Sequence, residues 1–335
     1  MIEMRDIELK TKKGYASTIR ILNERFEFTS FNDISLVAFQ QFINEIAKYN
    51  PNTGRPFSKK LLSDIKHTAK NIFSYAEVND VPGVRLSIFD HVQIPSVATR
   101  RTRYSLTEEQ QEWVISFEHR AQLPAMIMLF SGLRKGEVIP LRWKNVDLVK
   151  GVIYVQEFVR FDSNRPTIKA KGKTENATRA VPIPGILKDF LYTEYERQTM
   201  IFQKTHPRES RESIDEEVIC KNSNGTIHTE SSWKRMWKTY MIDLNVKYGY
   251  NDRVSKHTHS TLPMLIDTFT AHNLRHTFRT ILYLEGIDAQ TSMEIMGHSD
   301  IRTTIDIYTD IKRMGKMSIS DDYRHHLDTD FKVEI

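Results

Sequence analysis

Apolar residues recur at helical spacing along most of this 335-residue chain, and this pattern constrains its fold more than any other feature. Three stretches in the first ninety residues each carry an apolar stripe on one helix face, at residues 15–26, 36–46 and 62–76. Strand-like alternation is confined to residues 151–159 and 178–183, which a polar stretch separates. The sequence therefore predicts a mainly α fold with a small antiparallel β-sheet, of the α+β class.

A break in the helical pattern marks a boundary between two domains. Residues 81–105 contain Pro82, Gly83 and Pro95 and lose helical spacing, as expected of a linker. The predicted parts of the chain are a helical domain of residues 1–90, a basic linker of residues 91–106, a second domain of residues 107–315 and a C-terminal tail of residues 316–335.

The second domain begins with a clear helix-start signal. Thr107 is followed by two acidic residues, and Gln110 stands at the capping-box position, so a helix is predicted from there to residue 130. Helical spacing returns after residue 185 and holds to about residue 313. Two polar stretches interrupt it, near residues 204–217 and 248–270.

Cysteine and apolar content exclude several classes of protein. The single cysteine, Cys220, rules out a disulfide framework and a thiolate-rich zinc module. The longest apolar run, residues 123–130, includes a proline and is too short to cross a bilayer. The N-terminus lacks the apolar core of a signal peptide. We therefore expect a cytoplasmic protein with no membrane partner.

Positive charge is concentrated in the first two thirds of the chain. The net charge is +5, and residues 1–200 hold 30 basic against 23 acidic residues. The densest basic cluster is Arg100, Arg101 and Arg103 in the linker, and Lys59, Lys66 and Lys70 lie off the apolar stripe of the third helix. Both groups suit a DNA phosphate backbone, although a soluble linker and a solvated helix face explain them equally well.

Four segments of the second domain carry residues suited to chemistry. They are SGLRKGEV (131–138), KGKTENATRAVPIP (171–184), HNLRHTF (272–278) and MGHSDIRTTIDIYTD (296–310). Taken singly, Arg134 is explained as a surface arginine, His272 with Arg275 as a helix-surface pair, and Tyr308 as a half-buried aromatic. The pair His257 and His259 favours a loop over a metal site, because no third ligand has suitable spacing.

The joint occurrence of these segments in this order resembles the tyrosine recombinase, or phage integrase, family. That family has an arginine in a G-L-R-x-G-E turn, a lysine in a β-hairpin, an H-x-x-R helix, a G-H-S turn and a tyrosine about ten residues later. The resemblance spans residues 107 to about 315. It extends more loosely over residues 10–90, which look like the family's helical core-binding domain.

The resemblance implies a set of six active-site residues. They are Tyr308 as the nucleophile, with Arg134, Lys173, His272, Arg275 and His298 around the scissile phosphate. Two arginine forks suit the non-bridging oxygens, whose negative charge grows in the transition state. The leaving 5′-oxygen needs a proton, which a hairpin lysine can supply. Lys173 fits better than Lys171, because it stands nine residues before Pro182, as in many integrases of this type.

The remaining two roles fall to the histidines. His272 can accept or relay the tyrosine proton, and His298 can donate a hydrogen bond to the phosphate. No step requires a metal, a nucleotide or another cofactor.

The implied activity is site-specific cleavage and rejoining of DNA through a 3′-phosphotyrosyl intermediate. It would serve integration and excision of a mobile element or prophage in a bacterium. The expected partners are double-stranded recombination sites, further copies of this chain in a tetramer on two duplexes, and accessory excision or DNA-bending proteins. A type IB topoisomerase and a non-catalytic DNA-binding protein are the alternatives.

Three features depart from the family pattern or lack an assigned role. The first helix begins near residue 11, so either no arm-binding domain is needed or the chain given is shortened. The stretch 246–270 is longer than a minimal version needs. The tail after residue 315 is apolar enough to require burial, on its own domain or, as we favour, on a neighbouring copy.

Overall fold

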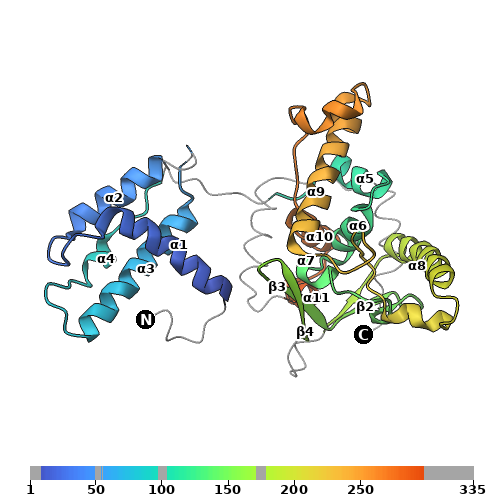
Figure 1. The fold of residues 1–335 in the computed structure, drawn as a ribbon, viewed down its shortest axis with the longest axis horizontal. Helices are drawn as coiled ribbons and strands as arrows, with labels where there is room; N and C mark the ends of the chain where they lie inside the picture. The colour runs from blue at the N-terminus through green and yellow to red at the C-terminus, as the bar shows by residue number, and fades with distance from the viewer. Residues whose placement is uncertain (1–8, 50–53, 55, 97–103, 171–178, 298–335) are drawn as a thin grey trace. The chain divides into compact units, whose positions relative to one another are not determined.

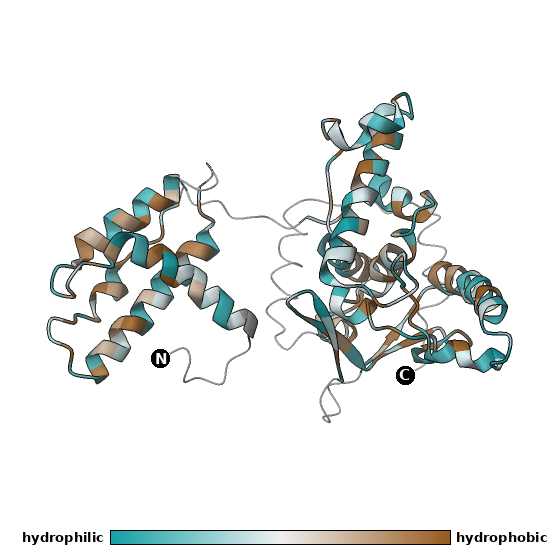
Figure 2. Cartoon of the chain, viewed as in Figure 1, coloured by the Kyte–Doolittle hydropathy of each residue, from teal (hydrophilic) through white to brown (hydrophobic). Residues whose placement is uncertain are grey.

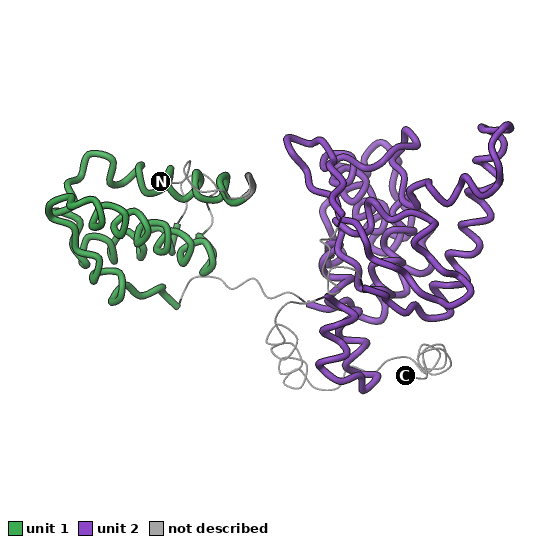
Figure 3. The backbone as a smooth tube through the Cα atoms, turned by 90° about the horizontal axis from the view of Figure 1, so that it is seen from below, with its two compact units in different colours: residues 1–102 green, residues 103–335 purple. Residues whose placement is uncertain are grey.

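The computed structural model describes residues 9–49, 54, 56–96, 104–170 and 179–297 (Figure 1). The chain divides into two compact units, residues 1–102 and residues 103–335 (Figure 3). Helices predominate in both, and the strands form small antiparallel sheets, which confirms the predicted fold class. Within the described ranges, every helix is too short or too polar to span a membrane.

Unit 1 is a bundle of amphipathic helices. Its helices are α1 (Leu9–Phe26), α2 (Leu36–Lys48), α3 (Lys59–Val78) and the short α4 (Ile88–His91). Ser35 and Ser58 cap α2 and α3, each accepting a hydrogen bond from a backbone N–H three residues later. Hydrophobic and hydrophilic bands alternate along α3 in Figure 2, and the predicted stripe residues Leu62, Ile65 and Ala69 are buried in the core.

Unit 1 continues past the predicted domain end at residue 90. Pro82 and Gly83 form a turn and do not end the domain, since the chain returns through α4. The Phe89 ring is fully buried between Phe39 and Phe73, at centroid distances of 5.0 and 4.8 Å, and Val92 is also in the core. The break at residue 81 is thus a turn inside unit 1, and the structure extends this unit beyond the predicted end at residue 90.

Two of the lysines predicted on the outer face of α3 hold this returning segment. The Lys66 ammonium donates to the Val92 carbonyl at 2.7 Å, and Lys70 pairs with Asp90 at 2.7 Å. Lys59 is exposed at the start of the helix. Two of the three cations thus have partners inside unit 1.

Unit 2 surrounds a helix that is buried on every side. Residues 124–131 of α6 are all buried, and α6 packs on α5, α8 and α10. In Figure 2 hydrophobic colour gathers where these helices meet the strands. The helices of unit 2 are α5 (Glu108–Ser116), α6 (Gln122–Ser131), α7 (Lys135–Val138), α8 (Gly185–Thr205), α9 (Glu230–Leu244), α10 (Ala271–Leu284) and α11 (Ala289–Met296), with short 3₁₀ or π turns at Trp143–Asn145, Arg211–Glu216, Asn245–Gly249 and Lys256–Thr261.

The start of α5 confirms the predicted capping box, but the helix is shorter than predicted. Thr107 accepts from the Gln110 N–H, and the Gln110 side chain accepts from the Thr107 N–H, both at 3.2 Å. The helix ends at Ser116, and α6 begins at Gln122. Pro124 explains the break, since proline lacks the amide hydrogen and is tolerated only in the first turn of a helix.

The strands form two sheets where one was predicted. Strands β1 (Val146–Asp147), β2 (Val152–Val155) and β5 (Arg179–Pro182) make a sheet in the order β1-β2-β5, while β3 (Glu157–Asp162) pairs with β4 (Arg165–Ala170). The predicted strand 151–159 is in fact two strands. Ile153, Val155 and Val159 keep one alternation throughout, so the pattern does not reveal the change of partner. Strand β4 was missed because its side chains are mostly exposed.

The stretch 246–270 has a structural role that the sequence did not reveal. Its last residues are held by side chains from three directions: Gln110 donates to the Asp267 carbonyl at 3.0 Å, Tyr104 to the Thr268 carbonyl, and Trp237 to the Phe269 carbonyl at 3.1 Å. These bonds place the chain immediately before α10. His257 and His259 lie in its 3₁₀ turn.

Replacing Phe89 by alanine is expected to destabilise unit 1 by about 3–5 kcal/mol, because a fully buried ring is removed and a cavity remains. Peptide-resolved hydrogen exchange of the full chain separates unit 1 from unit 2 and measures the effect. Phe28→Ala is the matched control, since the Phe28 side chain is 96% exposed. Unchanged protection of α2 and α3 in Phe89→Ala would show that α4 is not part of the core.

Candidate active site

Arg134 stands on a turn that requires a glycine. Helix α6 ends at Gly132, whose φ of +62° is left-handed. A Cβ atom there would come within 2.3 Å of the Phe278 ring, so neither the backbone conformation nor the space suits another residue. The turn leads directly into α7 and leaves the Arg134 side chain 44% exposed.

His272 and Arg275 lie in the first turns of α10. The Asn273 side-chain oxygen accepts from the Thr270 backbone N–H at 2.9 Å at the start of this helix, and the Asn273 amide donates to the Tyr104 carbonyl at 2.9 Å. His272 is exposed, whereas Arg275 is only 3% exposed. Both residues line one cavity, so the structure brings them together.

The two arginines meet at the end of α11. Arg275 donates to the Met296 carbonyl at 2.5 Å and to the Gly132 carbonyl, and Arg134 donates to the Gly297 carbonyl at 3.0 Å. The two guanidinium groups therefore bind consecutive carbonyls of one turn. Segments far apart in the sequence converge here on the carbonyls of Met296 and Gly297.

Among the described residues, the like charges around Arg275 outnumber the opposite charge of Glu137. Burial, together with the like charges of Arg134, Arg179 and Arg279, lowers the pKa of the Arg275 guanidinium, and Glu137 only partly opposes this shift. A buried cation among other cations is stabilised by an added anion. The site is therefore suited to a phosphate group.

Two residues that the sequence analysis missed hold this arrangement together. Glu137 is 4% exposed, and its carboxylate accepts from the Arg134 backbone N–H at 2.9 Å and from the Arg134 side chain at 3.3 Å. Arg179, on β5, binds the same carboxylate with both ends of its fork, at 3.0 and 2.8 Å. Arg179 also donates to the Ile295 carbonyl at 2.9 Å, and a Cβ at Gly297 would come within 2.9 Å of it.

Signals for both residues were present in the motifs. Glu137 is the glutamate of G-L-R-x-G-E, three residues after Arg134, which is the capping-box spacing. Arg179 lies at the start of the predicted strand 178–183. The sequence did not show that Arg179 points to Glu137. Only the pairing of β5 with β2, which places Arg179 opposite Val155, brings these two residues together.

A cavity of about 900 Å³ opens beside the arginines. Arg134, His272 and Arg275 line one part of it, and Lys135, Lys234 and Lys238 add further positive charge. None of the described residues that line it is acidic. Such a one-signed surface concentrates anionic ligands.

Residues 105–314, which include this site, match the phage integrase family. The chain belongs to this family. A "Tyrosine recombinase XerC-like" protein of Caldanaerobacter subterraneus subsp. tengcongensis is 24% identical over 83% of this chain and 68% of its own length. "Tyrosine recombinase XerD" of Staphylococcus aureus is 27% identical over 56% of this chain, which spans about half (48%) of that relative. The integrase is thus a tyrosine-type site-specific recombinase, as predicted.

Solved structures of integrases share the fold. The Tn1549 transposon integrase, solved with transposon right end DNA, superposes with a TM-score of 0.67 at 22% identity, covering 97% of this chain and 94% of the other. A lambda integrase (75–356) dimer bound to a COC′ core site gives 0.59 at 16% identity, covering 96% and 95%. The similarity includes both units.

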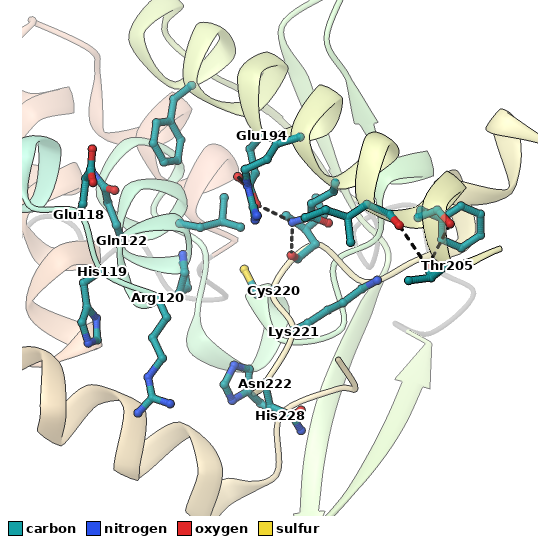
Figure 4. A pocket seen from close by; sticks show the side chains of 18 of the residues that line it. Glu118, His119, Arg120, Gln122, Glu194, Thr205, Cys220, Lys221, Asn222 and His228 are labelled. Carbon is teal, nitrogen blue, oxygen red and sulfur yellow. Dashed lines mark hydrogen bonds and ion pairs between the residues drawn. The ribbon is translucent and has the colours of Figure 1, made fainter. Parts of the chain in front are cut away.

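A second cavity of the integrase, of about 630 Å³, differs in charge (Figure 4). Glu118 and Glu194 line it together with Arg120 and Lys221. Cys220 is buried beside it, and burial raises the pKa of the Cys220 thiol. A protonated, buried thiol is a poor nucleophile, so Cys220 is not suited to nucleophilic chemistry in this cavity.

Several predicted site residues lie outside the described residues. These are Lys173, with its alternative Lys171, His298, Tyr308, and the linker arginines Arg100, Arg101 and Arg103. The tail after residue 315 also lies outside them. Their roles stay predictions.

Replacing Arg179 by alanine is expected to destabilise unit 2 of the integrase by about 3–5 kcal/mol, because the Glu137 carboxylate loses its bidentate partner while buried. Denaturant unfolding measures the loss. In the double variant Glu137→Gln with Arg179→Ala the charge is gone, so part of the stability should return. Lys144→Ala is the control: its pair with Glu216 is 46% and 67% exposed and should contribute at most about 1 kcal/mol. Equal effects of Arg179→Ala and Lys144→Ala would contradict the argument.

Proposed function

We propose that this recombinase cuts and rejoins double-stranded DNA through a 3′-phosphotyrosyl bond to Tyr308. The observation that carries the proposal is the meeting of Arg134, Arg275 and His272 on one cavity whose described lining has no acid. Family membership supports the nucleophile, since residues 105–314 of the match include Tyr308.

The two arginines would stabilise the transition state of phosphoryl transfer. Negative charge grows on the non-bridging oxygens as the attacking oxygen adds, and fixed guanidinium donors lower the energy of that state most. Arg275 is held by two carbonyls and buried, so it needs little rearrangement when DNA binds. His272, at the exposed edge of the same cavity, would accept or relay the tyrosine proton.

The other assigned residues complete the reaction. Lys173 would protonate the departing 5′-oxygen, and His298, which follows Gly297 in the chain, would donate a hydrogen bond to the phosphate. The phosphotyrosine retains the energy of the broken bond, so a second 5′-hydroxyl can attack it and reseal the strand. No cofactor takes part in this scheme.

The biological setting that we propose is integration and excision of a mobile element. The similarity to a transposon integrase solved with transposon end DNA supports this choice, as do the G-H-S-D-I and Y-T residues of the last motif. Partners would be recombination sites, other copies of this chain in a tetramer, and accessory excision or DNA-bending proteins. The match to the phage integrase family favours recombination over relaxation by a type IB topoisomerase.

We assign the contacts with the DNA backbone outside the active site to basic residues of unit 1 and the linker. Lys59 is exposed and suited to a phosphate, as are Arg100, Arg101 and Arg103 by their sequence. Lys66 and Lys70 would have to exchange their partners Val92 and Asp90 for phosphates, so we expect smaller contributions from them.

The Tyr308→Phe variant is expected to bind DNA normally and to form no covalent adduct, because only the attacking oxygen is removed. Trapping on a nicked suicide duplex, read as a shifted protein band, tests this. An adduct that persists in Tyr308→Phe would assign the nucleophile to another residue, and Tyr323 would be the next variant. Absence of an adduct in the unaltered protein would favour a non-catalytic DNA-binding role.

The Lys173→Ala variant is expected to cleave a normal phosphodiester far more slowly, by about 10²–10⁴-fold, because a general acid is lost. A substrate with a 5′-thiolate leaving group needs no proton, so its cleavage should be nearly unaffected. Single-turnover rates on the two substrates measure the difference. Lys171→Ala is the matched control. Equal slowing on both substrates would make Lys173 a charge stabiliser only.

A further inference from the structure

The cavity beside the arginines extends well beyond the phosphate-binding groups. One wall is α9, with Lys234 and Lys238 on its exposed face and the side chains of Trp237 and Met241 below them. The opposite wall comes from the long stretch 246–270, through the residues Ser260, Leu262 and Met264. The cavity thus joins a cationic rim to an apolar wall.

The side chains of the apolar wall are partly exposed to solvent. Met264 is 42% exposed, and Leu262 is only half-buried. The wall is nevertheless held in place, because Asn245 donates to the Pro263 carbonyl at 3.0 Å and accepts from the Leu265 N–H at 2.8 Å. A contiguous apolar surface with a polar rim is a feature of binding sites.

The charge of the rim identifies the kind of occupant. Lys135, Lys234 and Lys238 surround the cavity together with Arg134, and the described lining contains no acid. Lys234 pairs with Glu230 at 2.9 Å, but the Lys234 side chain is 69% exposed, so that pair is weak and exchangeable. A polyanion that also presents apolar groups fits both halves of the cavity.

Resting on the proposed function, we propose that a groove edge of the duplex beside the cleaved phosphate enters this cavity, and that Leu262 and Met264 read thymine methyl groups there. The C5-methyl of thymine is the apolar group that a base pair presents in the major groove. The lysines would position the backbone, while the apolar wall would distinguish thymine from cytosine. The stretch 246–270 would then determine part of the site preference.

The size of the cavity limits where this reading takes place. A compact volume of about 900 Å³ is roughly 10 Å across, so it admits the groove edge of about three base-pair steps of 3.4 Å and not the full width of a duplex. The methyl groups that matter should therefore lie within about three base pairs of the phosphate that Tyr308 attacks.

The test compares thymine with uracil, which lacks only the methyl group. The full chain selects its preferred duplexes from a randomised pool, and the covalent adduct maps the cleaved phosphate. Each thymine within three base pairs is then replaced by uracil, and Kd is measured. One buried methyl contributes about a fourfold change in Kd. We expect uracil to raise the Kd of the unaltered protein about fourfold at one or more of these positions.

Variants of Leu262 and Met264 test whether the apolar wall causes the preference for thymine. Leu262→Ser and Met264→Ser should bind the thymine and uracil duplexes with nearly equal Kd. Lys238→Gln should weaken both duplexes by the same factor and reduce the salt dependence of binding. Leu265→Ser is the matched control, because Leu265 is 60% exposed on the same stretch but does not line the cavity. It should keep the fourfold preference.

The outcomes separate this inference from the proposed function. An adduct that forms with equal Kd for thymine and uracil at every position overturns the inference alone. Loss of the preference in Leu265→Ser as large as in Met264→Ser also overturns it, because the effect would then be one of general folding. Absence of any selected duplex and of any adduct overturns both proposals.

Discussion

Two arginine side chains of like charge bind neighbouring carbonyls in the candidate active site, and one buried carboxylate lies between them and Arg179. Arg134 and Arg275 would repel each other by a few kcal/mol at contact distances in a partly buried site. Glu137 supplies the compensating charge, while the carbonyls of Gly132, Met296 and Gly297 accept the guanidinium hydrogens. The remaining positive charge is then available to a phosphate.

The Glu137 carboxylate also connects parts of unit 2 that lie far apart in the sequence. Arg179 binds Glu137 through both nitrogens and donates to the carbonyl of Ile295, so β5 is joined to α7 and to the end of α11. A side chain at position 297 would collide with the Arg179 guanidinium, so only glycine fits there. Preorganised donors of this kind give a larger rate enhancement than donors that must be arranged during the reaction.

The stretch 246–270 serves two purposes that its composition did not suggest. Its end is held by Gln110, Tyr104 and Trp237, and this sets where α10 begins and so where His272 and Arg275 stand. Its middle forms the apolar wall of the cavity. Under the proposed roles, a change in the middle of this stretch would alter DNA preference through the wall, while its anchored end would keep His272 and Arg275 in place.

The sequence by itself determined the helical class and the family, and it singled out Arg134, His272 and Arg275 as candidates, because periodicity and short motifs are local properties that one segment displays. It also determined the capping box at Thr107. Only the tertiary structure decided that Arg179 binds Glu137, that residues 88–92 complete the core of unit 1, and that β2 and β3 belong to different sheets. These depend on which surfaces meet in space, and the alternation of Ile153, Val155 and Val159 is the same for either strand pairing.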